Sequence, residues 1–216
     1  MARASGTTIP KSKIPEESRS LILRAALQEF AQEGFAGART EAIAKAAGVN
    51  IALIFYYFKN KEQLYGEALD SNYAEWNKRM LAALGAADSP RRKIRGYVSA
   101  HFDFVAETPS RSRLVLQEMM RKGRSGSPHI LRLARKYIRK VHQELAKVVR
   151  EGTKAGDFNP LDPENFVYSV VGMINFYFAC APALKAVSGH EPLGPASITR
   201  RKAEVMRFIT QALFAK

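Results

Sequence analysis

The stretch from Ala42 to Lys61 reads AIAKAAGVNIALIFYYFKNK and decides how the chain is expected to fold. Two short helical patterns are separated by Gly-Val-Asn, and Gly48 can end the first because glycine adopts a positive φ without steric cost. Asn50 can accept a hydrogen bond from the free amides that begin the second helix. That helix carries four consecutive aromatic residues starting at Phe55, more aromatic surface than a short helix can easily bury. The stretch therefore predicts two crossed helices whose aromatic face needs a partner.

The two predicted helices have an inner and an outer face. Ile54 and Phe58 are one turn apart, so both can pack on the preceding helix. The apolar residues expected to lock the pair in place are Ile43, Ala44, Ala47, Val49, Ile54 and Phe58. The outer face then shows Ala52, Leu53, Phe55, Tyr56 and Tyr57. This is the geometry of a helix-turn-helix, whose second helix fits a DNA major groove about 12 Å wide.

The remainder of the chain is also predicted to be helical. A first helix shows apolar residues at three- and four-residue spacing up to Phe30 and ends at Gly34, after which Phe35 can pack back on Phe30. Gly and Pro mark most later breaks, and no β alternation of useful length occurs. Longer helices are expected over about residues 60–85, 90–107, 111–122, 128–154, 163–187 and 197–214. The predicted fold is all-α, with a flexible basic arm (1–17), a three-helix DNA-binding domain (18–62) and a roughly six-helix bundle (63–216).

Composition limits the class of protein. Lys and Arg number 34 against 20 Asp and Glu, a formal charge of +14, which favours acidic partners such as nucleic acid or an anionic membrane face. The single cysteine, Cys180, excludes an intramolecular disulfide, and a cytoplasmic location is expected. The segment 166–184 carries no charge and is about as long as a short membrane span. Pro182 and several polar side chains in it argue instead for a helix buried from two sides.

Residues 22–69 carry a resemblance to a known family. The run ILRAALQEFAQE, followed by GFAGARTEAIAKAAGVNIALIFYYFKNKEQLYGEAL, resembles the DNA-binding domain of the TetR family of bacterial transcriptional regulators. The resemblance implies a homodimer that binds a near-palindromic operator. It also implies that the operator is released when a small molecule enters the C-terminal domain, so the expected function is that of a ligand-responsive repressor.

The resemblance assigns roles within the helix-turn-helix. Thr40 and Lys61 match phosphate-contacting positions, and Tyr57 stands where the family usually has a His or Tyr near the DNA backbone. Phe55 departs from a common Tyr, and Arg39 departs from a common Ser or Thr, so the helix cap is expected to shift to Thr40. Ala52, Leu53 and Tyr56 are candidates for contacts to base edges. The predicted DNA-binding set is Arg39, Thr40, Asn50, Ala52, Leu53, Tyr56, Tyr57 and Lys61.

Other functions remain open at this point. The aromatic residues could form the interface of a protein-binding or small-molecule-binding module without operator function. The histidines show no metal-ligand spacing and no catalytic motif occurs, so neither an enzyme nor a metal or cofactor is predicted. Residues 121–154 carry eleven Lys or Arg against two Asp or Glu. This basic run fits the solvated face of an amphipathic helix, or alternatively a second surface for phosphates or an anionic ligand.

The helical bundle is expected to hold a ligand and to form a dimer. Ligand sites in bundles lie between helices and are mostly apolar, which suits a small apolar or aromatic effector, although core packing could equally explain these residues. The predicted lining comprises His101, Phe102, Val105, Met119, Met120, Val170, Met173, Asn175 and Tyr177. The resemblance also implies a dimer seam made by the last two helices. Its predicted residues are Phe176, Phe178, Ala181, Val205, Phe208, Ile209 and Leu213.

Overall fold

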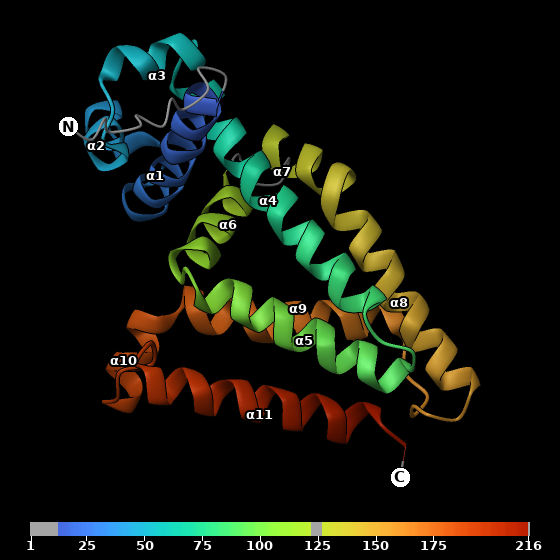
Figure 1. The fold of residues 1–216 in the computed structure, drawn as a ribbon. Helices are drawn as coiled ribbons and strands as arrows, with labels where there is room; N and C mark the ends of the chain where they lie inside the picture. The colour runs from blue at the N-terminus through green and yellow to red at the C-terminus, as the bar shows by residue number, and fades with distance from the viewer. Residues whose placement is uncertain (1–12, 122–126, 216) are drawn as a thin grey trace, which may run out of the picture. The chain divides into compact units, whose positions relative to one another are not determined.

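The computed structural model describes residues 13–121 and 127–215, and Figure 1 shows its helices. Residues 1–12 of the expected arm lie outside this part. The chain divides into two compact units, one up to Ser71 and one from Asn72 onward, so the boundary falls within a helix and later than the expected residue 62. The described residues form helices joined by short connections and contain no strand longer than an isolated bridge. The predicted all-α fold is confirmed.

The first unit comprises α1 (Lys13–Gly37), α2 (Thr40–Ala47), α3 (Ile51–Tyr57) and the start of α4 (Lys61–Gly85). Helix α1 begins at Lys13, so residues 13–17 are helical and not part of an arm. Gly34, with φ of 69°, interrupts α1, and the Phe35 ring stacks on Phe30 with centroids 6.1 Å apart, as predicted. Tyr65 of α4 meets Phe30 edge-on at 4.8 Å. These rings fix α1 against α4 within this unit.

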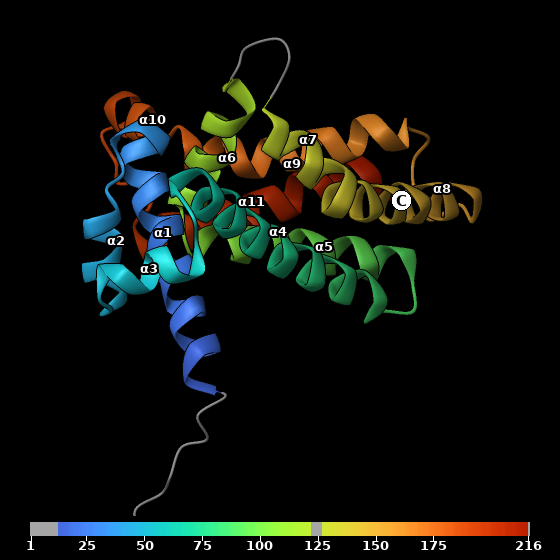
Figure 2. The same ribbon diagram turned by 90° about the horizontal axis from the view of Figure 1, so that it is seen from above.

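The second unit contains the rest of α4 and seven further α-helices, shown from a second side in Figure 2. They are α5 (Pro90–Ala106), α6 (Ser110–Met120), α7 (Pro128–Leu133), α8 (Arg139–Lys154), α9 (Pro163–Ala179), α10 (Ala181–Ser188) and α11 (Pro195–Leu213). Helix α9 packs against α5, α6 and α8, while α11 packs on α5 and α9. Proline stands in the first turn of α5, α7, α9, α10 and α11, where its missing N–H costs no helical hydrogen bond.

Two long helices expected from the sequence are interrupted. The predicted helix 163–187 breaks at Cys180 because Pro182 starts a new helix, and α9 and α10 meet at a bend of 72°. In the described part of the chain no single helix is long and apolar enough to cross a membrane, and only this bent pair passes on length and composition. Residues 128–154 contain a π-helical turn, η2 (Ala134–Ile138), between α7 and α8. Asn77 donates a hydrogen bond of 2.8 Å to the Tyr137 carbonyl in that turn.

Candidate functional site

The turn between α2 and α3 has the predicted geometry. Gly48 adopts φ 67° and ψ 30°, and Val49 N donates to the Ala44 carbonyl at 3.0 Å, which satisfies the end of α2. The Asn50 side chain accepts a 2.8 Å hydrogen bond from Ala52 N and caps α3. Ile54 and Phe58 are buried, each about 1% exposed. The inner face of α3 is therefore fixed by caps and by core packing.

The outer face of α3 presents aromatic side chains to solvent. Tyr56 is 79% exposed and Phe55 is 54% exposed. The Tyr56 and Tyr57 rings meet edge-on with centroids 5.2 Å apart, which orders both on a short helix. Ala52 is exposed, and Leu53 is half-buried. The predicted outer face is confirmed as a surface, and its contacts with DNA stay a prediction.

Two of the residues predicted to contact DNA phosphates, Lys61 and Arg39, make hydrogen bonds within the first unit. The Lys61 ammonium donates to the Ala36 carbonyl at 3.2 Å and lies 5.2 Å from the Phe35 ring centroid. Arg39 precedes α2 and makes no side-chain cap, and its backbone N–H donates to Glu29 at 3.0 Å. The expected cap at Thr40 does not form, because Thr40 is already the first residue of α2. The Glu29 side chain of α1 instead accepts a hydrogen bond from the backbone N–H of Arg39, the residue before α2.

The second unit forms a partly open cavity of about 380 Å³ between its helices. Its apolar wall includes Trp76 of α4, Phe104 of α5, Val115 and Met119 of α6, and Val171 of α9. Its polar side chains are Asn72, Tyr73, Tyr97, His101, Arg111, His142, Tyr168 and Asn175. Among the described residues that line the cavity there is no Asp or Glu. A mostly apolar enclosure with a few polar groups is the usual form of a small-molecule site.

Comparison with known proteins identifies both units. Residues 22–68 match the family model described as bacterial regulatory proteins, tetR family, and residues 69–216 match the YcdC-like protein, C-terminal region. The chain belongs to the TetR family. It is 30% identical over 183 residues to the HTH-type transcriptional regulator RutR of Escherichia coli K12, covering 85% of this chain and 84% of RutR.

The chain is also similar to two further proteins. The HTH-type transcriptional repressor SCO4008 of Streptomyces coelicolor is 30% identical over 174 residues, covering 80% of this chain and 84% of that protein. The crystal structure of AibR in complex with isovaleryl coenzyme A and operator DNA has a TM-score of 0.69 at 16% identity, covering 90% of this chain and 97% of AibR. The last similarity shows the shared fold. The chain is thus a TetR-family transcriptional regulator.

A hydrogen-bonded cluster forms one wall of the cavity. His101 Nδ1 lies 3.3 Å from the Tyr97 hydroxyl and 3.4 Å from the Trp76 indole nitrogen, and His101 Nε2 lies 3.0 Å from the Asn175 amide nitrogen. Ser112 donates to Asn175 Oδ1 at 3.1 Å. Burial lowers the pKa of His101 to about 4, so the imidazole is neutral near pH 7. The cluster is therefore polar but uncharged.

Four of the nine side chains predicted to line a ligand site do line this cavity. They are His101, Val105, Met119 and Asn175. The other five do not line it: Phe102, Met120, Val170, Met173 and Tyr177.

These five residues belong to other helix faces. Phe102 is fully buried and meets Phe178 with ring centroids 5.3 Å apart, whereas Met120 is 72% exposed. On α9 the cavity face runs through Val171 and Asn175, one turn apart. The Tyr177 hydroxyl instead donates to the Pro192 carbonyl at 2.6 Å. The sequence pattern indicated an apolar helix but not which side of it faces the cavity.

The cavity also contains residues that the sequence analysis missed, among them Asn72, Trp76, Arg111 and His142. Arg111, Val115 and Met119 follow one another at four-residue spacing, so they share one face of α6. That spacing was visible in the sequence and could have found Arg111 from Met119.

The seven residues of the predicted dimer seam fall into a buried group and an exposed group. Phe178, Ala181, Val205, Ile209 and Leu213 are buried within the single chain, at most 4% exposed. They are core residues of the single chain, and a role for them in a dimer seam stays a prediction. Phe176 and Phe208 are 65% and 62% exposed. Only these two of the predicted seven remain open to a second copy.

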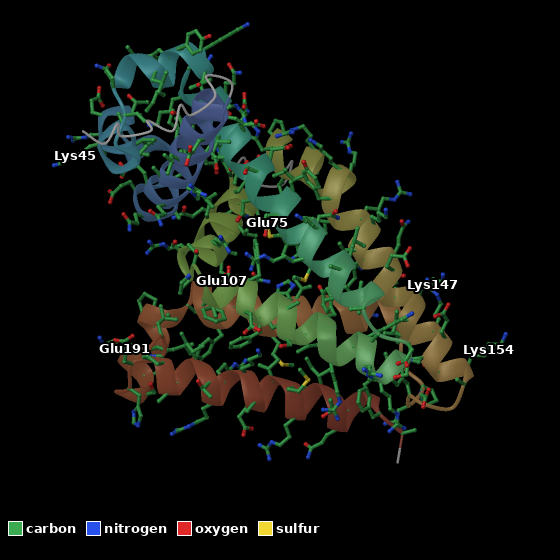
Figure 3. All side chains as sticks on the ribbon, in the orientation of Figure 1. Lys45, Glu75, Glu107, Lys147, Lys154 and Glu191 are labelled. Carbon is green, nitrogen blue, oxygen red and sulfur yellow. The ribbon has the colours of Figure 1, made fainter. Side chains whose placement is uncertain are left out.

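The basic run is the outer face of α7, η2 and α8. Residues 122–126 of it lie outside the described part of the chain. Lys147 and Lys154 point away from the bundle in Figure 3, and Val148 and Val149 are buried on the other side of α8. Arg150 lies 3.3 Å from Glu164, and Lys147 lies 3.8 Å from Glu151. This arrangement favours the solvated amphipathic face, and a second anionic partner stays a prediction.

Proposed function

We propose that this TetR-family regulator is a repressor that binds a near-palindromic operator as a homodimer and is released by a small molecule. The observation that carries the proposal is that one chain joins a capped helix-turn-helix with an exposed aromatic face to a unit that contains an apolar cavity. AibR, a protein of the same fold, has been crystallised with both operator DNA and isovaleryl coenzyme A.

The DNA contacts follow from the chemistry of α3 and its flanks. Ala52, Leu53 and Tyr56 present apolar and aromatic surface that suits thymine methyl groups and base edges. Arg39, Thr40, Tyr57 and Lys61 hold the protein on the phosphates, and Asn50 fixes the start of α3. Because α3 itself carries no charged side chain, sequence preference depends on methyl contacts and on DNA shape.

The homodimer follows from the exposed apolar surface of the second unit. Phe176 of α9 and Phe208 of α11 are mostly exposed, and Val187 of α10 is 88% exposed. Phe176 and Val187 line the same surface hollow, and exposed apolar patches mark interaction sites. A two-fold dimer places two copies of α3 on two half-sites about 34 Å apart or a multiple of this distance.

Helix α4 supplies a route for effector control. Lys61 lies in its first turn, and Asn72, Tyr73 and Trp76 of the same helix line the cavity. An effector that changes the position of α4 changes the spacing of the two α3 helices in the dimer. Coupling is reciprocal, so an effector that weakens DNA binding must bind the DNA complex less tightly by the same factor.

Selection of duplexes from a random DNA pool tests the operator proposal. The protein should enrich a two-fold symmetric sequence, and its affinity for that sequence should fall steeply between about 50 and 200 mM salt. Enrichment of no sequence, or of one without two-fold symmetry, would overturn the proposal. In that case the exposed aromatic face of α3 would point to a protein partner.

A further inference from the structure

A single arginine stands in the wall of the apolar cavity. Arg111 lies in the first turn of α6, on the same face as Val115 and Met119, and all three line the enclosure. The Arg111 side chain is 18% exposed. Since the described lining contains no Asp or Glu, the cavity holds a cation without an opposing anion of its own.

The partners of Arg111 do not neutralise it fully. Its Nη1 donates to the Phe104 carbonyl at 2.8 Å, and the guanidinium carbon lies 4.2 Å from the Phe104 ring centroid. The carboxylate of Glu107 is 3.9 Å away, and its other oxygen already accepts a 2.6 Å hydrogen bond from Arg79. Burial lowers the pKa of Arg111 although Glu107 opposes this effect. The guanidinium is therefore partly desolvated, and its nearest carboxylate is at 3.9 Å and is shared with Arg79.

Unsatisfied polar atoms are concentrated around the same cavity. Arg111 Nε, Asn72 Oδ1 and His142 Nε2 are buried and have no hydrogen-bond partner among the described residues. These are three of the seven such side-chain atoms there, and all three residues line the cavity. Buried polar groups are normally hydrogen-bonded, so this concentration indicates a polar occupant. The Nε–H of Arg111 requires an acceptor from that occupant.

We infer that the cavity binds an organic acid, a small and mainly apolar molecule whose carboxylate pairs with Arg111. The inference rests on the proposed function only in taking this cavity as the effector site. A carboxylate matches the planar fork of a guanidinium, and a charge-assisted hydrogen bond is stronger than a neutral one. The apolar body of the acid lies against Trp76, Val115, Met119 and Val171.

The charge of the lining favours a monoanion. A phosphate monoester carries about −1.5 to −2 charges at neutral pH, so a single arginine would leave part of that charge unpaired in an apolar enclosure. His142 Nδ1 lies 3.1 Å from Glu164, so this ring already has an acidic partner outside the cavity lining. One carboxylate is the group that Arg111 can balance alone.

The only tryptophan of the chain, Trp76, lines the cavity and reports binding through its fluorescence. The probes are 3-phenylpropionate and octanoate, each compared with its primary amide at about pH 7.5. At least one acid should bind at least about tenfold more tightly than its amide, since the two differ mainly in charge. Arg111→Gln should remove this preference, and Arg111→Lys should restore part of it.

Arg113→Gln is the matched control, because Arg113 is an exposed residue of the same helix that does not line the cavity. It should keep the full preference for the acid. Circular dichroism and the thermal midpoint check that Arg111→Gln is folded. The inference is overturned if no acid changes Trp76 fluorescence, if amides bind as tightly as acids, or if Arg111→Gln weakens both equally.

The acid-binding experiment and the operator-binding experiment can fail independently. An Arg111-dependent preference for acids supports the inference even when the acid leaves operator affinity unchanged, and in that case only the proposed release by an effector fails. Conversely, operator binding by the unliganded protein supports the proposed function even when acids and amides bind alike.

Discussion

The two units of this chain depart from ordinary burial in opposite directions. The first exposes aromatic rings on α3, where Tyr56 is 79% open to solvent. The second buries polar groups, where His101 is 3% exposed and hydrogen-bonds within an apolar wall. Local caps and a small aromatic core hold the exposed face in place, whereas helix packing from several directions creates the buried cluster.

The difference indicates where each unit binds its partner. An exposed aromatic ring is stabilised when its apolar surface is buried against a partner, and DNA offers base edges and thymine methyl groups for such contacts. A buried polar atom without a hydrogen-bond partner is stabilised when a molecule bound in the cavity supplies that hydrogen bond. Neither feature helps the isolated chain to fold, so each indicates binding.

The largest expected effect comes from the apolar surface of the second unit. Phe208→Glu places a charge on exposed α11 surface that we propose is covered by a second copy, and burying an unpaired charge is costly. Sedimentation at micromolar concentration should show a monomer. Operator affinity should fall at least about a hundredfold, because a palindrome needs both half-sites occupied.

Ala203→Glu serves as the control for charge on the same helix. Ala203 is exposed, and it lies on the side of α11 opposite the buried Val205 and Ile209. A dimer that survives Phe208→Glu, or that Ala203→Glu disrupts equally, would contradict this interface.

The buried cluster predicts a pH dependence that the exposed face does not share. The pKa of His101 is lowered to about 4, below its ordinary 6.5, so the unfolded chain binds a proton that the folded one rejects. Stability should therefore fall as pH drops from about 6.5 to about 4, by on the order of 3 kcal/mol from this residue alone. Urea unfolding across that range measures the slope.

His101→Gln should flatten that slope relative to the unchanged protein. His190→Gln is the control because His190 is exposed on the turn after α10, and its slope should match that of the unchanged protein. Equal slopes for all three proteins would show that His101 does not control the acid sensitivity.

The contrast also explains which parts could be predicted from the sequence. Local chemistry specifies Gly48, Asn50 and the two faces of α3, and all three predictions are confirmed. The caps act within a few residues, so the sequence contains the information directly. The start of α1 was missed because residues 13–17 lack the apolar spacing on which the prediction depended.

Cavity residues are harder to predict because several faces of an apolar helix are similar. Helix α9 carries apolar residues nearly all round, and only packing against α5, α6 and α8 decides that Val171 lines the cavity while Val170 does not. The same ambiguity placed Ile209 in the dimer seam, although it is 2% exposed within one protomer. Tertiary contacts, absent from a single sequence, resolve both.

A smaller effect is expected at the exposed face itself. Tyr56→Ala removes a ring that is mostly in solvent, so stability should change by less than about 0.5 kcal/mol. Affinity for the selected palindrome should fall about tenfold, and affinity for random DNA should change little, because base contacts specify and phosphate contacts do not. Fluorescence anisotropy with both duplexes measures the ratio.

Tyr56→Phe separates the ring from its hydroxyl. Retention of most of the specificity would assign the effect to the ring, whereas its loss would assign it to the hydroxyl. An equal loss of affinity for both duplexes in Tyr56→Ala would exclude Tyr56 as a base-reading residue.

The smallest effect concerns Lys61, which has a role in the free protein as well. Its ammonium donates to the Ala36 carbonyl and lies over the Phe35 ring, so Lys61→Ala removes a contact between α4 and the end of α1. An exposed cation–π contact contributes only about 0.5 to 1 kcal/mol, so the variant should still fold. Its operator affinity should fall severalfold, with the same factor for random DNA, since a phosphate contact carries no sequence information.

Salt separates the two roles of Lys61. If Lys61 meets a phosphate, each subunit of Lys61→Ala loses one contact, and the slope of log K against log salt should become shallower by about 0.9 per contact. Lys61→Arg keeps the charge and should keep the slope. Reduced affinity with an unchanged slope would mean that Lys61 acts only by packing on Phe35 and holding Ala36. The phosphate contact would then have to come from another cation, and the exposed Arg39 would be the next residue to replace.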